Sequence, residues 1–456
     1  MTGEDQPWAG RRLHFVGIGG AGMSGLAAVA ARLGATVTGS DAGESAYLAK
    51  VREAGIDPAV GPHDATHVPA GDDVEVVVST AIADDNPERA AARERGLREL
   101  HRSEILGELS GLKRCIAITG THGKTTTTAM TVRALRAAGM DPAYVAGGRL
   151  TETGANAEWG SGDWIVVEAD ESDRSLLNLH PDIAVLTNLE LDHHSTYGSR
   201  LDLEDTVRRF LAMAPAAVIW DRPELLALRD GPVEAYEVSD PALGAAGSRF
   251  TLDGVEVRLP VPGHHNARNA AGALTAARLA GADPVAAAAG LAEFAGTGRR
   301  FEHVGTTAAG AVVFDDYAHH PTEVAATLQA ARTLQPRRLV AVFQPHLYSR
   351  TAALHREFGE ALALADLVVV LDVYRSREDP ADHPGVTGRM VAVAAADAAG
   401  GRPVAWMPGF DEAERYLRAT VGQGDLVLTL GAGNVDGLAR RLVVADDAQE
   451  AGQPAR

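Results

Sequence analysis

The stretch Cys-Ile-Ala-Ile-Thr-Gly-Thr-His-Gly-Lys-Thr-Thr, residues 115–126, decides the fold of this chain. It starts as a short apolar run of strand length, turns through two glycines, and continues as a helical pattern over residues 125–138. A glycine loop between a strand and a helix binds phosphate, because the backbone amides of the loop and the N-terminus of the helix both attract negative charge. The stretch therefore predicts an α/β domain that binds a nucleotide.

This loop is a shortened form of the P-loop. Ile118 stands where the standard pattern G-x-x-x-x-G-K-[ST] has its first glycine. The chemical elements are still present, because Lys124 can reach the β- and γ-phosphate oxygens and the Thr125 hydroxyl can bind Mg²⁺. A glycine-lysine loop without a nucleotide is the weaker alternative. We therefore expect ATP to bind at Gly120, Thr121, His122, Gly123, Lys124, Thr125 and Thr126.

A second glycine loop lies near the N-terminus. Gly-Ile-Gly-Gly-Ala-Gly, residues 17–22, follows the apolar run 12–16 and matches G-x-G-x-x-G, and Asp41 closes the next predicted strand about 20 residues further on. The glycines allow the backbone to approach a diphosphate, and the acid is placed to bind a ribose. A nucleotide diphosphate is expected here. The loop alone does not separate NAD from a UDP-sugar, and a purely structural turn is the alternative.

Strand-like and helix-like segments alternate along the whole chain. Three systems of strand, loop and helix begin near residues 12, 115 and 311. This alternation predicts parallel sheets with helices on both faces. The 456 residues are long enough for three such α/β domains, which we place at residues 1–105, 106–300 and 301–456.

The composition is typical of a soluble globular protein. A formal net charge of −19 argues against nonspecific binding to DNA, RNA or anionic membranes. No stretch approaches the ~20 apolar residues of a membrane span, and residues 1–10 contain no apolar signal region, so a cytoplasmic location is expected. The one cysteine, Cys115, excludes an intramolecular disulfide and is expected to be a buried structural thiol.

Acidic and histidine residues follow two more predicted strands of the central domain. Glu168 ends an apolar run and begins Glu-Ala-Asp-Glu-Ser-Asp, residues 168–173, while Asp192-His193 follows the apolar run 183–187. Carboxylates at the carboxyl edge of a parallel sheet lie where ligands bind. A solvated loop and a structural histidine are the alternatives. Beside an ATP loop, Glu168 is interpreted as a Mg²⁺ ligand that opposes the γ-phosphate.

Two further segments carry polar side chains next to predicted elements. Gly-His-His-Asn-Ala-Arg-Asn, residues 263–269, opens a helix predicted over residues 267–280, and its simplest interpretation is helix capping by asparagine. Asp-Asp-Tyr-Ala-His-His, residues 315–320, follows the first strand of the third domain. Its spacing matches no known zinc pattern.

Together these motifs resemble the Mur ligases of bacterial cell-wall synthesis. Several are weak alone, but they occur in the family's order over essentially the whole chain, which makes the combination specific. The motifs are Gly-Ile-Gly-Gly-Ala-Gly-Met-Ser-Gly (17–25), Gly-Thr-His-Gly-Lys-Thr-Thr (120–126), Glu-Ala-Asp-Glu-Ser-Asp (168–173), Thr-Asn-Leu-Glu-Leu-Asp-His (187–193), Gly-His-His-Asn-Ala-Arg-Asn (263–269), Arg-Arg-Phe-Glu (299–302), Asp-Asp-Tyr-Ala-His-His-Pro-Thr-Glu (315–323) and Gln-Pro-His-Leu-Tyr-Ser-Arg-Thr (344–351).

The resemblance implies a Rossmann-like N-terminal domain that binds UDP, a central P-loop ATPase-like domain, and a C-terminal Rossmann-like domain that helps to hold an amino acid. The motifs are most similar to those of family members that add L-alanine to the carboxylate of UDP-N-acetylmuramate. That reaction forms an acyl phosphate and releases ADP and phosphate. The implied cofactors are ATP and Mg²⁺. The implied partners are these two small-molecule substrates, with no nucleic acid, no membrane, and a monomer or weak homodimer.

The resemblance also implies roles for single residues around the ATP loop. Lys124 and Glu168 would act on the transferred phosphoryl group, and His193 would bind a second Mg²⁺, with Asn188 supporting the same edge. Related ligases use a carbamylated lysine after the Asp-His motif, but no lysine follows Lys124 in this sequence, so that device is excluded. The implied UDP-sugar residues are Gly17, Gly19, Gly20, Gly22, Met23, Ser24 and Asp41, and the further ATP contacts are His265, Asn266, Asn269, Arg300 and Asp315.

The implied amino-acid pocket lies in the third domain. Arg350, with Tyr348, would face the alanine carboxylate, because a guanidinium fork matches a carboxylate. Tyr317 and His319 would line the reacting cleft, and His319 is the candidate base for the ammonium proton. Leu347 stands where some relatives have a second arginine, so glycine and serine stay open as substrates.

Three alternatives remain at this stage. An NAD-dependent dehydrogenase would explain the first loop but gives Lys124 no role, and it would bind NAD without binding ATP. A nonenzymatic sensor would bind a UDP-sugar without releasing phosphate when amino acids are added. A recycling ligase would attach a whole peptide to UDP-N-acetylmuramate, although residues 21–25 match the alanine-adding type better.

Overall fold

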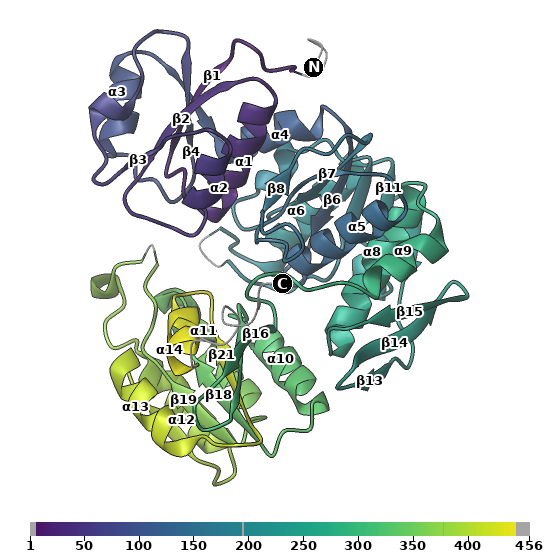
Figure 1. Cartoon of the computed structure of the whole chain (residues 1–456), viewed down its shortest axis with the longest axis vertical. Coiled ribbons are helices and arrows are strands. Elements are labelled where there is room, and N and C mark those ends of the chain that lie inside the picture. Colours follow the sequence, from purple (N-terminus) through teal and green to yellow (C-terminus); the bar gives the residue numbers. More distant parts are fainter. Residues whose placement is uncertain (1–5, 194–195, 377, 444–456) are drawn as a thin grey trace, which may run out of the picture. The chain divides into compact units, whose positions relative to one another are not determined.

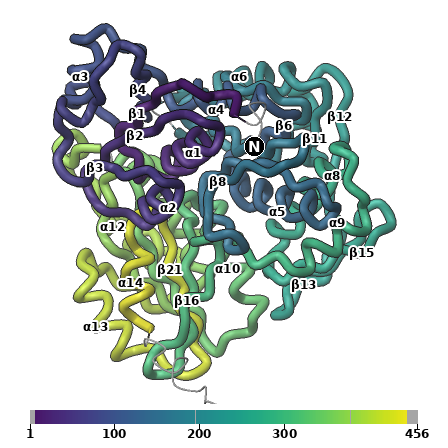
Figure 2. The backbone as a smooth tube through the Cα atoms, turned by 45° about the horizontal axis from the view of Figure 1, so that its top comes forward, coloured from purple at the N-terminus to yellow at the C-terminus, as the bar shows by residue number. Residues whose placement is uncertain are grey.

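The computed structural model describes residues 6–193, 196–376 and 378–443. They divide into two compact units. Unit 1 comprises the described residues within 6–241, 249–260 and 266–298, and unit 2 comprises those within 242–248, 261–265 and 299–443. Figures 1 and 2 colour the chain from purple at the N-terminus to yellow at the C-terminus.

Unit 1 begins with a five-stranded parallel sheet in the order β3-β2-β1-β4-β5. The order reverses at β1, whose two neighbours are β2 and β4, and this is the switch point at which an open α/β sheet binds its ligand. The strands are β1 (Arg12–Val16), β2 (Thr36–Asp41), β3 (Ala59–Val60), β4 (Val74–Val78) and β5 (Arg98–His101), and the helices are α1 (Ala21–Arg32), α2 (Leu48–Glu53), α3 (Pro87–Glu94) and α4 (Arg102–Ser110).

A seven-stranded sheet follows in unit 1, in the order β12-β11-β10-β6-β9-β7-β8. All its pairs are parallel except β7 with β8. Its strands are β6 (Arg114–Thr119), β7 (Ala143–Val145), β8 (Ala157–Glu158), β9 (Trp164–Glu168), β10 (Ile183–Leu186), β11 (Ala216–Trp220) and β12 (Val233–Tyr236). Its helices are α5 (Lys124–Ala137), α6 (Arg200–Met213), α7 (Pro223–Leu226), α8 (His264–Leu279) and α9 (Pro284–Leu291), and α5 packs beside α9 (Figures 1 and 2).

The position of β6 determines the site. β6 lies between β9 and β10, so the segments that follow all three strands meet at one edge of the sheet. Ile116, Ile165 and Val185 are fully buried in this sheet. Apolar side chains on both faces explain why these strands appear in the sequence as continuous apolar runs.

Unit 2 contains a six-stranded sheet in the order β16-β17-β21-β18-β19-β20. Only the β16–β17 pair is antiparallel. The strands are β16 (Glu302–Thr306), β17 (Val312–Asp316), β18 (Arg338–Phe343), β19 (Leu367–Val370), β20 (Val404–Trp406) and β21 (Asp425–Leu430), and the helices are α10 (Pro321–Thr333), α11 (Tyr348–Leu362), α12 (Gly388–Ala398), α13 (Phe410–Thr420) and α14 (Val435–Leu442). A separate three-stranded sheet is formed by β13 (Ala242–Gly244), β14 (Gly247–Leu252) and β15 (Val255–Leu259).

The predicted α/β class with parallel sheets is confirmed. One predicted element is wrong at its start, because α8 begins at His264 rather than at residue 267. Gly263 makes the preceding turn with φ of +101°, so the helix starts directly after it. Asn266 and Asn269 therefore lie within the helix instead of capping it. The boundaries at residues 105 and 300 stay predictions.

Two other properties of the chain can be stated from the structure. Cys115 is fully buried in β6, as predicted, and burial raises the pKa of its thiol well above the usual range. Across the described residues, no helix combines the length and the apolar character that a membrane crossing requires.

Candidate functional site

The second glycine loop has a shape that only glycine allows. Gly120 has φ of +136° and Gly123, the residue before α5, has φ of +81°. A Cβ atom at Gly120 would lie 2.1 Å from Oγ1 of Thr187, and one at Gly123 would lie 2.5 Å from Oδ1 of Asn269. The backbone therefore forms a tight cradle at the N-terminus of a helix of 14 residues, and the residues present fit a bound phosphate.

The neighbouring strand β10 fixes this loop. The Thr187 hydroxyl donates to the carbonyl of His122 at 2.7 Å, and Nδ2 of Asn188 donates to the same carbonyl at 2.8 Å. In return, the amide of His122 donates to Oδ1 of Asn188 at 2.9 Å. Because Thr187 and Asn188 directly follow β10, the pairing of β10 with β6 sets the shape of the loop.

The ammonium group of Lys124 is surrounded by acceptors, and its side chain is only 13% exposed. Its Nζ donates to the carbonyls of Gly120 at 2.7 Å and Thr121 at 3.2 Å, and it lies 2.9 Å from Oε2 of Glu171. Burial alone would lower the pKa of Lys124, but Glu171 and two neighbouring carboxylates more than offset this, so the pKa is raised. Lys124 is therefore charged, as a phosphate-binding lysine must be. Sequence reasoning did not single out Glu171.

Oxygen atoms suitable for magnesium lie beside the loop. The Thr125 hydroxyl donates to Oε1 of Glu168 at 3.1 Å, and the amide of Gly147 donates to Oε2 of Glu168 at 2.6 Å. A hydroxyl and a carboxylate oxygen are ligands that Mg²⁺ prefers, so this pair fits the ion. His193 has φ of +55°, and its Nε2 lies 3.4 Å from Oε1 of Glu171. The structure thus places His193 next to the partner of Lys124, and its role as a metal ligand stays a prediction.

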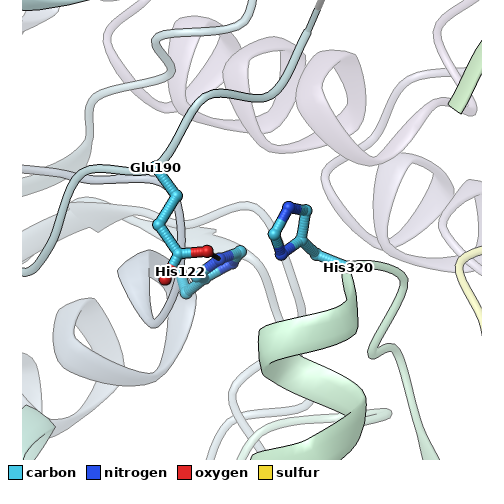
Figure 3. Close-up of side chains that lie close together, drawn as sticks. All are labelled: His122, Glu190 and His320. Carbon is cyan, nitrogen blue, oxygen red and sulfur yellow. Dashed lines mark hydrogen bonds and ion pairs between the residues drawn. The ribbon is translucent and has the colours of Figure 1, made fainter. Parts of the chain in front are cut away.

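The outer part of the loop contacts a further acid. Nε2 of His122 lies 3.4 Å from Oε2 of Glu190 (Figure 3). The amide of Glu190 donates to the Thr121 hydroxyl at 2.8 Å, which in turn donates to the carbonyl of Glu190 at 3.0 Å. Thr126, which follows in α5, is 7% exposed. The side chains of Thr121 and His122 therefore hold the loop in place through their contacts with Glu190. His320, drawn in the same figure, precedes α10 of unit 2.

The first glycine loop follows β1 and is fixed by the end of β2. The amide of Gly17 donates to the carbonyl of Ser40 at 2.8 Å, and the amide of Gly19 donates to Oδ2 of Asp41 at 2.8 Å. A Cβ at Gly19 would lie 2.9 Å from the same oxygen, and one at Gly20 would lie 3.4 Å from the carbonyl of Gly17. Asp41 therefore holds the loop directly, which the predicted ribose contact did not anticipate.

The residues that follow this loop are packed into α1. Met23 and Ser24 are 3% and 1% exposed. Nδ2 of Asn156 donates to the Ser24 hydroxyl at 3.3 Å. A Cβ at Gly22 would lie 3.3 Å from Nη1 of Arg102. Met23 and Ser24 support the loop from beneath, and their predicted contact with a UDP-sugar stays a prediction.

Arg102 connects the surroundings of the two loops within unit 1. The residue opens α4 next to Gly22, and its Nη2 donates to Oδ2 of Asp170 at 3.1 Å. Asp170 belongs to the acidic run after β9, and its pKa falls to about 2 because the charges of Lys124 and Arg102 outweigh the effect of burial. Sequence reasoning missed Arg102, since nothing near it in the sequence marks it as special.

Unit 2 holds the predicted residues of the third domain. Asp315, at the end of β17, is 1% exposed, accepts a hydrogen bond from the Thr429 hydroxyl at 2.6 Å, and pairs with Nε of Arg299 at 2.9 Å. Burial raises its pKa, and Arg299 only partly offsets that effect. Asp315 thus fixes Arg299, a residue that sequence reasoning did not single out. Its proximity to a nucleotide stays a prediction.

Asp316 is a second buried carboxyl group. It accepts hydrogen bonds from the amides of Phe301 at 2.7 Å and Ala318 at 2.8 Å. Burial raises the pKa of Asp316 from 3.8 to about 6, although the charge of Arg300 and these amides act in the opposite direction. Its protonation therefore changes just below neutral pH.

Aromatic and basic side chains gather where β17 and β18 end. The ring centroid of His319 lies 5.3 Å from that of Tyr317 and 6.1 Å from that of His346. Nη1 of Arg350 lies 3.4 Å from Nδ1 of His346, and Arg350 is 5% exposed. Leu347 precedes α11 with φ of +70°. The structure therefore brings Tyr317, His319 and Arg350 together, and it adds His346 to the set.

The other predicted residues are divided between the two units. Asn266 and Asn269 are 7% and 8% exposed in unit 1. In unit 2, a Cβ at Gly263 would lie 2.7 Å from the ring of His265. The Arg300 guanidinium lies 5.0 Å from the ring centroid of Tyr317, and Tyr348 stacks on His383 at 5.8 Å.

Family models match three consecutive parts of the chain. The Mur ligase family catalytic domain matches residues 12–114, the Mur ligase middle domain matches residues 118–277, and the Mur ligase glutamate ligase domain matches residues 299–433. The chain belongs to the Mur ligase family. The resemblance inferred from the motifs is confirmed, and so is the α/β architecture of three domains that it implies.

Individual proteins match over almost the full chain. A UDP-N-acetylmuramate–L-alanine ligase from Kineococcus radiotolerans is 48% identical over 93% of this chain and 94% of its own length. The crystal structure of a UDP-N-acetylmuramate–alanine ligase from Thermotoga maritima matches with a TM-score of 0.80 and 30% identity, over 94% of this chain and 98% of that one. A murein peptide ligase from Psychrobacter arcticus matches with a TM-score of 0.69 and 26% identity, over 95% and 98%.

The two glycines at the ends of α5 provide a matched test of the cradle. Gly123 and Gly139 have φ of +81° and +77°, but a Cβ at Gly139 would meet nothing within 4 Å. We expect Gly139→Ala to lower the free energy of unfolding by about 1–2 kcal/mol, because alanine is strained in the left-handed backbone conformation. Its ATP affinity should be unchanged. Gly123→Ala also displaces Asn269, so its ATP affinity falls about tenfold or more. Thermal unfolding and calorimetric titration with Mg-ATP measure both effects, and equal losses of affinity would contradict the role of the cradle.

The raised pKa of Asp316 predicts a pH-dependent stability. A carboxyl group whose folded pKa is raised stabilises the fold while it is protonated, so this contribution is full below pH 3.8 and is lost as pH rises through about 6. We expect the native chain to lose on the order of 3 kcal/mol relative to Asp316→Asn between pH 4 and pH 7. Denaturant unfolding of both proteins across this range measures the difference. Parallel curves would show that Asp316 titrates normally.

Proposed function

We propose that this chain joins L-alanine to the carboxylate of UDP-N-acetylmuramate and converts ATP to ADP and phosphate. Two relatives with this named activity support the proposal. They are 48% and 30% identical to the chain and match at least nine-tenths of it. The chain is an ADP-forming acid–amino-acid ligase of peptidoglycan precursor synthesis. We expect the reaction to take place in the cytoplasm, with Mg²⁺ required.

One structural observation supports the proposal independently of the names of the relatives. Unit 1 contains two glycine loops of different type, each at the carboxyl edge of its own parallel sheet. The loop after β6 has a buried, charged lysine and a hydroxyl–carboxylate pair, as phosphoryl transfer requires. The loop after β1 has no lysine and is fixed by Asp41, and its glycines and the following helix N-terminus suit a diphosphate. A dehydrogenase would leave the loop after β6 without a purpose.

The first chemical step activates the carboxylate. An oxygen of the substrate carboxylate attacks the γ-phosphorus of ATP, the bond to the β-phosphate oxygen breaks, and ADP leaves, so that an acyl phosphate forms. Lys124 and the loop amides hold the transferred group and disperse its charge. Thr125 and Glu168 would hold Mg²⁺, which when bound neutralises charge on the phosphate oxygens.

The second step forms the amide bond. The neutral amine of alanine attacks the acyl carbon, and phosphate departs with its electron pair. His319 is the proposed acceptor of the ammonium proton. Its Nδ1 lies 3.0 Å from the carbonyl of Tyr317, which can only accept a hydrogen bond, so in the neutral ring Nδ1 carries the proton and Nε2 carries the lone pair. This tautomer suits a general base that uses Nε2.

The proposed amino-acid site centres on Arg350. Its buried guanidinium can bind the alanine carboxylate in a bidentate manner. His346 lies beside it, and Leu347 contributes an apolar side chain at the position where some relatives have a second arginine. A single arginine leaves selection among small amino acids to the apolar walls, where one methyl group changes binding by only about 1 kcal/mol.

An ADP-release assay tests the reaction. Purified chain is mixed with Mg-ATP, UDP-N-acetylmuramate and each of the twenty amino acids in turn. We expect ADP to form fastest with L-alanine, more slowly with glycine or serine, and only when the UDP-sugar is present. Binding of NAD without ADP release from any mixture would instead support a dehydrogenase.

A comparison of two substrates distinguishes this function from that of a recycling ligase, which attaches a whole peptide. L-alanine and a tripeptide are tested at equal concentration in the same assay. We expect phosphate release with alanine to exceed that with the tripeptide at least about tenfold, since one hydrogen-bonded contact discriminates by this much. Preference for the tripeptide would reverse the assignment, and it would also fit the weaker likeness to a murein peptide ligase.

Lys124→Ala tests the division of labour between the loops. We expect it to abolish phosphate release, with a loss of about a thousandfold or more, because the transferred group loses its cation. UDP affinity should stay within twofold, since the hydrogen bonds and the ion pair of Lys124 go to Gly120, Thr121 and Glu171 of the central sheet. Lys50→Ala, which removes a surface lysine paired with Glu53, is the matched control. Loss of UDP binding together with phosphate release would show that the two loops do not act separately.

A further inference from the structure

A buried carboxylate lies in the first sheet of unit 1, away from the phosphate-transfer groups. Glu88, in the first turn of α3, is 0% exposed. Its Oε2 lies 2.7 Å from Nε2 of His14, and its Oε1 lies 2.6 Å from Nδ1 of His63. The Ser40 hydroxyl donates to both oxygens, at 2.7 and 2.8 Å, and Nδ1 of His67 lies 3.4 Å from Oε1.

These contacts join several segments of the first sheet. His14 lies in β1, Ser40 in β2, His63 after β3, and His67 in the 3₁₀ turn Ala65–His67. Glu88 itself follows β4. A residue within β1, a residue near the end of β2 and the segments that follow β3 and β4 therefore meet at one buried carboxylate. In an open α/β sheet, the ligand binds beyond the carboxyl ends of the strands, where the segments after β3 and β4 lie.

The protonation pattern of this network follows from its geometry. Burial acts to raise the pKa of Glu88, but hydrogen bonds from His14, Ser40 and His63 lower it to about 2, so the group is ionised. An ionised carboxylate only accepts, so both imidazoles donate to it. His14 can then accept at Nδ1 from the Thr38 hydroxyl, 2.9 Å away, so both of its ring nitrogens have a partner.

His63 differs from His14 in the ring nitrogen that a ligand can approach. Its Nδ1 is 2.6 Å from Glu88 and 3.2 Å from the Ser40 hydroxyl, and its side chain is 17% exposed. The fixed Nδ1 leaves Nε2 as the ring atom that a ligand can approach. A carboxylate that fixes one nitrogen of a histidine orients the other, as in other histidine sites.

Ser40 transmits the position of Glu88 to the glycine loop. Its hydroxyl is held by Glu88, while its carbonyl accepts the amides of Gly17 at 2.8 Å and Ile18 at 2.9 Å. The next residue, Asp41, holds the amide of Gly19. Movement of Ser40 would therefore move the first half of the loop.

We propose that Glu88 is a positioning residue of the nucleotide-sugar site, which fixes the first glycine loop through Ser40 and orients Nε2 of His63 toward the bound nucleotide diphosphate. The proposal rests on the proposed function for the identity of the ligand. It assigns Glu88 no contact with substrate, and it separates nucleotide-sugar binding from phosphoryl transfer.

The test uses Glu88→Gln, Ser40→Ala and a matched structural control. Asn86 caps α3 by accepting from the amides of Glu88 and Arg89 at 2.9 and 3.4 Å, so Asn86→Ala weakens the same helix but leaves the carboxylate network in place. Glu88→Gln keeps the shape and removes the charge. Thermal unfolding is measured first, so that affinities are compared between variants of similar stability.

Two readouts are recorded for each variant of the full chain. Calorimetric titration with UDP gives the affinity of the first site without any turnover, and steady-state kinetics give the KM for each substrate. We expect Glu88→Gln and Ser40→Ala to weaken UDP binding and raise the KM for UDP-N-acetylmuramate about tenfold, as loss of a buried charged hydrogen bond predicts. The KM for ATP, the KM for L-alanine and kcat should stay within about threefold.

The double variant distinguishes positioning from general stability. If Glu88 acts through Ser40, the double variant Glu88→Gln with Ser40→Ala weakens UDP binding no more than Glu88→Gln alone. Equal loss of UDP affinity in Asn86→Ala and Glu88→Gln would overturn the proposal, as would unchanged affinity in Glu88→Gln. If Glu88→Gln does not fold, Ser40→Ala against Asn86→Ala gives the same decision.

The proposed function and this inference fail in different ways. If the native chain binds UDP but releases no ADP with any amino acid, the ligase function is ruled out. The titrations with UDP would still test the role of Glu88. If the native chain has ligase activity and Glu88→Gln binds UDP with unchanged affinity, only the proposed role of Glu88 is ruled out. His63→Asn, whose side-chain amide can keep the hydrogen bond to Glu88 but has no atom at the Nε2 position, should weaken UDP binding if Nε2 contacts the nucleotide, and unchanged binding would exclude that contact.

Discussion

The largely enclosed ammonium group of Lys124 is the constraint on which the central site depends. A cation cannot be removed from water unless other groups take over its solvation, and here two loop carbonyls and Glu171 do so. Glu171 is available because β9 lies next to β6, which brings the acidic run to the same edge as the loop. The strand order of the sheet therefore produces the charge arrangement that phosphoryl transfer requires.

The same edge also limits which residues can form the loop. Thr187 and Asn188 approach the loop from β10 on the opposite side of β6, and Asn269 approaches from α8. Gly120 and Gly123 are needed because these side chains leave no room for a Cβ atom. Shape and charge at this site thus have one origin, the central position of β6.

Much of the fold could be predicted because its signals are local. Both glycine loops, the strands before them and the helices after them lie within short segments, and their patterns indicate the right class. Glu171, Thr187 and Arg102 were missed as contacts because each meets its partner across 47 to 68 residues of sequence, and only the strand order brings the pairs together. Glu88 was missed for the same reason, since its partners lie 21 to 74 residues away. A pattern in one segment contains no information on which strand will be its neighbour.

The buried state of Cys115 has a practical consequence. The only thiol of the chain is enclosed in the middle of the central sheet, where burial also keeps it protonated. The folded protein should therefore behave toward alkylating dyes as if it contained no cysteine. One cysteine introduced on the surface of each unit would give a doubly labelled molecule with an unmodified interior, and fluorescence transfer between the dyes could then follow the two units during turnover.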